Sequence, residues 1–187
     1  MPRKSQPRVS GNATETPNEE NFVNNKISLD ELIRVVSLID YPLNLLPQSN
    51  GRAKYRFEKF GETKQVIYQD ILVIIEQYRS FMETGYFMIL DERVVGRHGL
   101  HEIQSKVLPR EKIDRILQGA VDAVDIFKSS SEDQKRNIIG MITRKLSADP
   151  KSVDLNIVDE ISRVSKVNIL QNAEESRKLF SKEEVEE

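Results

Sequence analysis

The two histidines of the chain lie close together, and they are the first side chains to consider for chemistry. His98 and His101 stand in the segment Arg97-His98-Gly99-Leu100-His101-Glu102. A zinc site needs three or four ligands on one side of the backbone, but Gly99 indicates a turn between the two rings. The chain holds no third histidine and no cysteine. We therefore expect no metal and no cofactor, and interpret both residues as solvated or capping side chains.

Motifs of catalysis are absent from the sequence. No Gly-rich phosphate loop precedes a predicted helix, no Gly-x-Ser-x-Gly segment occurs, and no cysteine can act as a nucleophile. Acidic pairs such as Asp122 with Asp125 have the spacing of an ordinary helix surface, and such spacing cannot establish two carboxylates across a cleft. We expect that the protein is not an enzyme.

A cluster of basic residues favours one alternative function. Between Glu92 and Arg115 the chain carries six basic and four acidic residues, and the pattern helix, turn at Gly99, helix has the outline of a DNA-reading motif. The excess of two positive charges is small for a phosphate-binding surface, which disfavours nucleic acid as a partner and favours a solvated helix face. If the chain is a small DNA-binding regulator, the contacts come from Arg97, Lys106, Arg110, Lys112 and Arg115.

Charged and apolar residues alternate strictly over 52–58, which predicts a half-exposed strand. With a return strand at 65–68, it would form a β-hairpin around Gly61. Tyr55 and Phe57 are expected to point inward, and Lys54 and Arg56 outward. The outward charges either protect the edge of the sheet or bind an acidic partner or a neighbouring strand.

The N-terminal segment 1–26 is a predicted arm, because it is too polar to offset the entropy cost of ordering by itself. It has a basic tip followed by the acidic residues Glu15, Glu19 and Glu20. We expect contacts with partner proteins from this arm and from the hairpin edge. The predicted contact residues are Arg3, Lys4, Arg8, Phe22, Val23, Lys54 and Arg56.

The elements between the ends are mainly helical. A capping box at Ser28 and Glu31 predicts a helix over 28–39, helical spacing predicts a central helix over 69–82 ended by Gly85, and the apolar run 86–90 predicts a buried strand. Asp91 is a predicted cap of a short helix. Only helices follow, near 109–117, 121–127, 132–146 and 154–167. Residues 173–187 are a predicted acidic tail.

The length and composition of the chain indicate one globular domain, and the order of its predicted elements indicates the fold class. The chain has 187 residues, 38% of them hydrophobic, with a net charge of −2. We predict one globular domain over 27–172 with an α+β fold: a small antiparallel sheet made of the hairpin and one strand, packed on the central helix, and a helical C-terminal half. No apolar run is long enough to be a secretion signal or a membrane span, so we expect no membrane partner.

The order of these segments resembles a group of poorly characterised structural proteins of tailed bacteriophages. The similarity covers about 52–170, and is carried by Tyr86-Phe87-Met88-Ile89-Leu90-Asp91-Glu92-Arg93-Val94-Val95, then His98-Gly99-Leu100, then Leu108-Pro109-Arg110-Glu111-Lys112-Ile113-Asp114. The N-terminal arm and the helix expected after it are additional to that pattern. The resemblance implies a non-enzymatic component of the virion, associated with capsid, neck or tail, made in the host bacterial cytoplasm. Its partners would be other virion proteins, in multiple copies.

Overall fold

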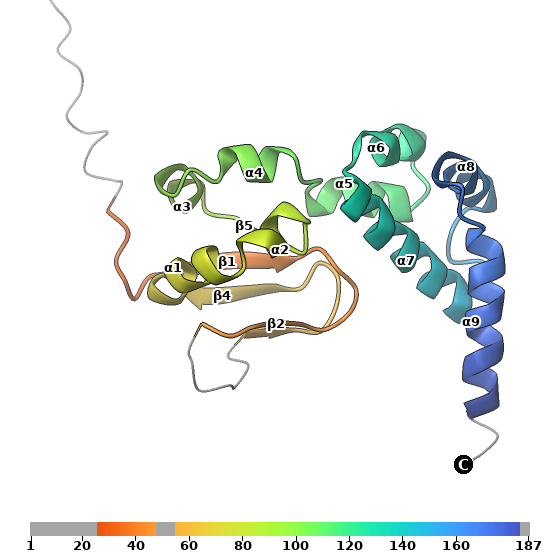
Figure 1. Cartoon of the computed structure of the whole chain (residues 1–187), viewed down its shortest axis with the longest axis horizontal. Coiled ribbons are helices and arrows are strands. Elements are labelled where there is room, and N and C mark those ends of the chain that lie inside the picture. The colour runs from red at the N-terminus through yellow and green to blue at the C-terminus, as the bar shows by residue number, and fades with distance from the viewer. Residues whose placement is uncertain (1–25, 48–54, 184–187) are drawn as a thin grey trace, which may run out of the picture.

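The computed structural model describes residues 26–47 and 55–183, and it has the predicted α+β fold with a helical C-terminal half (Figure 1). Its larger sheet is antiparallel with the strand order β4-β1-β5, and its smaller sheet pairs β2 with β3. The strands are β1 (Leu32–Ser37), β2 (Leu43–Leu45), β3 (Tyr55–Phe57), β4 (Thr63–Ile67) and β5 (Phe87–Ile89).

The central strand β1 corrects the prediction of a helix over 28–39. Ile33 and Val35 are buried on one face of the sheet, and strands β4 and β5 flank β1 on both sides. β-branched residues suit such a doubly flanked strand. The capping pair instead closes a turn: the Glu31 N–H donates to the Ser28 carbonyl (3.1 Å), and the Ser28 N–H donates to the Glu31 carboxylate (3.4 Å).

The predicted hairpin is also wrong in its pairing. β3 pairs with β2, with Phe57 opposite Leu43, and β4 pairs with β1. The inward positions of Tyr55 and Phe57 and the outward position of Arg56 are as predicted. Two strands that follow one another in the sequence thus belong to different sheets, because β1 offers β4 a longer apolar partner.

Short helices pack against the sheets and contribute to the core on their covered side. They are α1 (Tyr68–Gln77), α2 (Arg79–Glu83), α3 (Glu92–Arg97) and α4 (His101–Ser105). Gly85 ends the α2 segment at a positive φ of 76°, as its sequence position predicts, and the Asp91 side chain caps α3. Both sheets and these helices bury one set of side chains, which we call the N-terminal core; it includes Ile33, Phe57 and Ile74.

The C-terminal half consists of α5 (Arg110–Leu117), α6 (Ala123–Ser129), α7 (Glu132–Ala148), α8 (Leu155–Ser165) and α9 (Ile169–Glu183). They bury a second set of side chains, the C-terminal core, around Phe127, Ile138 and Ile161. The segment predicted as an acidic tail lies largely in α9, which packs along α7 and buries Ala173. Within the described ranges, no helix has the length and apolar character to cross a bilayer.

Helix α7 joins the two cores. Its Gln134 is 1% exposed and makes two hydrogen bonds with the backbone of Leu108: the Leu108 N–H donates to Oε1 (2.9 Å) and Nε2 donates to the Leu108 carbonyl (3.3 Å). The amide of Gln134 also lies against Gly85, where a Cβ atom would come within 2.9 Å of it. Farther along α7, Arg144 forms an ion pair with Asp40. These contacts fix the sheet relative to the helical half.

Candidate interaction surface

One face of the three-stranded sheet is only partly covered. Residues opposite one another in an antiparallel pair point to the same face. Ile33 and Val35 therefore share the face that is buried in the N-terminal core. On the other face lie Leu32 opposite Ile67, Arg34 opposite Gln65, and Val36 between Thr63 and Met88.

The helical half covers one end of this second face. Val36 is buried in the C-terminal core and Met88 packs against it. At the other end Leu32 is 53% exposed, and Leu90, whose N–H donates to the Arg34 carbonyl (2.9 Å), is 42% exposed. We call the uncovered part, made of Leu32, Arg34, Gln65, Ile67 and Leu90, the open sheet face.

The open sheet face combines apolar side chains with one positive charge. Leu32, Ile67 and Leu90 are the apolar members, and the exposed Leu29 lies in the turn just before β1. Arg34 is exposed among them, and within the described segments its guanidinium forms no ion pair. Such a surface fits an apolar partner that carries a carboxylate, because an ion pair beside buried apolar groups is weakly screened by solvent.

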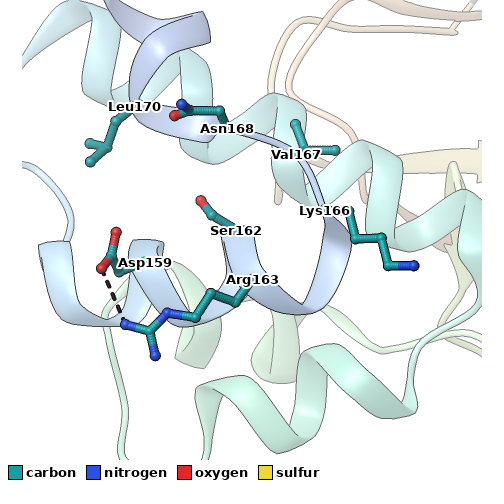
Figure 2. A pocket seen from close by; sticks show the side chains of 7 residues that line it. All are labelled: Asp159, Ser162, Arg163, Lys166, Val167, Asn168 and Leu170. Carbon is teal, nitrogen blue, oxygen red and sulfur yellow. Dashed lines mark hydrogen bonds and ion pairs between the residues drawn. The ribbon is translucent and has the colours of Figure 1, made fainter.

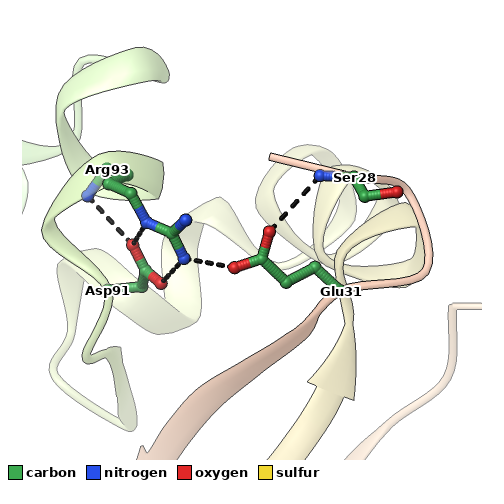
Figure 3. Close-up of polar contacts among 4 residues, drawn as sticks. All are labelled: Ser28, Glu31, Asp91 and Arg93. Atoms are coloured by element: carbon green, nitrogen blue, oxygen red, sulfur yellow. Dashed lines mark hydrogen bonds and ion pairs between the residues drawn. The ribbon is translucent and has the colours of Figure 1, made fainter. Parts of the chain in front are cut away.

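A cluster of charges holds the ends of β1 and β5 together (Figure 3). Arg93 forms an ion pair with Glu31, next to Leu32, and with Asp91, next to Leu90 (Nη2 to Oδ2 2.8 Å). The Arg93 backbone N–H also donates to Asp91 (3.0 Å). The hydrogen bond from Arg93 lowers the pKa of Asp91, against the opposing effect of burial. The cluster thereby fixes the relative positions of Leu32 and Leu90 on the open sheet face.

The edge of β5 is less accessible than this face. The Gln104 carboxamide of α4, in the orientation that pairs each atom with a complementary group, donates to the Ile89 carbonyl (3.2 Å) and accepts from the Ile89 N–H (3.0 Å). These are the groups that an added strand would need. At β5 the face of the sheet is therefore accessible to a partner, whereas the backbone groups of Ile89 at its edge are already hydrogen bonded to Gln104.

The predicted partner-binding residues lie mostly outside the described ranges. Arg3, Lys4, Arg8, Phe22, Val23 and Lys54 are among these undescribed positions. Arg56 is exposed on β3 and forms an ion pair with Glu58 (2.6 Å). Its role in partner binding stays a prediction. The open sheet face was not identified from the sequence, because the expected helix over 28–39 concealed the alternation of Leu32, Arg34 and Val36.

The basic residues of the alternative DNA-binding prediction do not form a single positive surface. Three of them have acidic partners: Lys106 with Glu102 (2.7 Å), Arg110 with Asp114 (3.3 Å) and Arg115 with Asp122 (2.7 Å). The helices α3 and α4 that flank Gly99 have only six and five residues. Phosphate binding by these side chains would have to compete with their own carboxylates. DNA binding stays a prediction without a supporting contact.

His98 is hydrogen bonded to a tyrosine, and His101 lies beside a glycine. The Tyr68 hydroxyl and His98 Nε2 are hydrogen bonded at 2.8 Å, and burial, with a smaller effect of Arg97, lowers the pKa of His98. His101 Nε2 lies near Gly96. In the segments that the structure describes, no three His, Asp or Glu side chains are close enough to hold a metal ion.

A groove of about 370 Å³ lies between α8 and α9 (Figure 2). Its charged residues include Asp159 and Arg163, which form an ion pair with each other (3.3 Å), and Lys166, whose side chain points away from that pair. Ser162 and Asn168 add polar groups. The groove does not bring a nucleophile and a base together, so it supplies no constellation for catalysis.

Comparisons of the chain with protein-family models, with curated proteins and with solved structures found no match.

Proposed function

We propose that this protein is a non-enzymatic subunit of a multi-copy assembly, the particle of a tailed bacteriophage, and that the open sheet face is a protein contact surface. The observation that supports the proposal most strongly is the position of Leu32 and Leu90, which are both large, apolar and exposed on the same face of the sheet. The sequence resemblance supports the choice of assembly. No cofactor is part of this function.

Contact at this surface is favourable because it removes apolar area from water. Fully burying a leucine stabilises by about 1.5–3 kcal/mol, so covering each half-exposed leucine contributes about 1 kcal/mol. A single such contact is weak. Repeated copies held in one particle multiply it, because each contact that forms raises the effective concentration for the next.

The test is to measure the chain in particles purified on a density gradient from infected cells that encode it, by quantitative peptide mass spectrometry against the most abundant shell protein. We expect a constant, simple ratio, and its size would distinguish a component of the whole shell from one of a neck or tail ring. Absence from particles, despite expression in the cells, would refute the virion assignment and favour the DNA-binding alternative.

A further inference from the structure

We propose that the open sheet face binds the N-terminal segment 19–23, Glu19-Glu20-Asn21-Phe22-Val23, of a second copy of this chain. This inference rests on the proposed function, since it names the partner for the same surface. Each copy would then donate one segment and accept another.

The charged and apolar groups of segment 19–23 match those of the open sheet face in type and in spacing. On β1, Leu32 and Arg34 are two residues apart on one face, a separation of about 7 Å along a strand. Phe22 and Glu20 are also two residues apart, so in an extended conformation they have the same separation on one side. Phe22 then packs on Leu32 while the Glu20 carboxylate meets the Arg34 guanidinium, which has no ion-pair partner in the described segments.

The position of Ile27 favours binding of the segment to the sheet of a second copy over binding to the sheet of its own molecule. Ile27 is buried in the N-terminal core, on the covered side of the sheet. To reach the open sheet face of its own molecule, the chain would have to turn around the end of the sheet between Val23 and Ile27. A neighbouring molecule removes this constraint, and the six Cα-to-Cα steps from Glu20 to Lys26 span up to about 20 Å.

The test uses charge exchange between two full-length variants. R34E places a carboxylate opposite Glu20, and E20R places a guanidinium opposite Arg34, so each variant alone carries a like-charge contact. We expect each to self-associate about tenfold more weakly than the wild type, measured as the dissociation constant by sedimentation velocity. When the two variants are mixed, the opposite charges face one another in every contact between unlike chains. The mixture is expected to recover the wild-type constant.

K112E is the matched control for the face variant, because Lys112 is an exposed cation on α5 of the helical half. K112E alone should therefore self-associate as the wild type does, whereas R34E should associate more weakly. F22A tests the apolar part and should also weaken association.

Three results would overturn the inference. The first is a wild-type chain that does not self-associate, and the second is single charge variants that associate as the wild type does. The third is recovery of the wild-type dissociation constant in the double variant R34E/E20R but not in the mixture, which would place the segment on the sheet of its own molecule. The proposed function fails separately. If the chain does not self-associate and yet is a constant component of particles, this inference is wrong and the proposed function stands.

Discussion

The sheet half and the helical half of the molecule differ in where they leave large apolar side chains exposed. In the sheet half, Leu29, Leu32 and Leu90 lie at neighbouring strand ends. In the helical half, the exposed ones are spread over a turn and two helices: Val121, Leu155, Val164 and Leu179. Scattered apolar residues are normal for a protein surface, whereas a grouped set on a rigid sheet is typical of an interface. This difference supports the proposal that the contact surface lies on the sheet half.

The largest effects are expected inside the two cores. Phe87→Ala in the N-terminal core and Phe127→Ala in the C-terminal core should each lower the free energy of unfolding by about 3–5 kcal/mol, since both rings are almost completely buried. Because Val36 of the sheet is part of the C-terminal core, we expect a single urea transition in wild type and in both variants. Two separate transitions, each shifted by one variant only, would show that the halves fold independently.

The next largest effect on the free energy of unfolding is expected at Gln134 of α7. Gln134→Ala removes both hydrogen bonds to Leu108 and leaves a buried N–H and carbonyl without partners, which costs about 1–3 kcal/mol. Arg136→Ala, at an exposed position on the same helix, should change the stability by about 0.5 kcal/mol or less. Equal effects of the two substitutions in urea unfolding would contradict the role of Gln134 in holding the Leu108 backbone against α7.

The Arg93 cluster should have a smaller, pH-dependent effect. Asp91→Ala removes the cap of α3, at a cost of about 1 kcal/mol at pH 7. Because the pKa of Asp91 is lowered in the folded protein, its contribution is present above the ordinary aspartate pKa and is lost as the pH falls through that value toward the folded one. Thermal unfolding of wild type and variant should therefore differ at pH 7 and converge in acid. A difference that stays constant with pH would refute the ion-pair contribution.

The smallest effect is expected at His98. Its pKa is lowered in the folded protein, mainly by burial, so the unfolded chain binds the proton more readily, and stability falls as the pH drops through the ordinary histidine pKa of about 6.5. His98→Gln removes this dependence while keeping a side chain that can bond to the Tyr68 hydroxyl. The loss of melting temperature between pH 7 and pH 5.5 should be smaller in the variant. An unchanged loss would show that His98 does not contribute.

Local signals in the sequence predicted much of the fold. Gly85 and Asp91 mark the ends of helices through their own backbone and side-chain chemistry, so the helices beside them could be placed from the sequence. Ile138, Ile142 and Leu146 are buried at helical spacing, which predicted α7 correctly. These features depend on residues close together in the chain.

Pairing between distant strands could not be predicted in this way. The helical period is matched by Leu29, Leu32, Ile33, Val36 and Ile39. The strand period is also matched, by Ile33, Val35 and Ile39. Pairing of β1 with β4 and β5 on either side stabilises the strand rather than the helix. For the same reason, the open sheet face was invisible in the sequence. It exists only because Arg34 and Leu90, far apart in the chain, become neighbours in the sheet.

The proposed virion role of the open sheet face is tested most directly by the incorporation of face variants into particles, measured as the ratio of this chain to the main shell protein by peptide mass spectrometry. L32D and L90D place a charge on the open sheet face, and V121D places the same charge at a fully exposed position of the helical half. We expect V121D at the wild-type ratio, and L32D and L90D strongly depleted, although all three variants are folded by circular dichroism. Equal incorporation of the three variants would contradict the claim that this face is the contact surface.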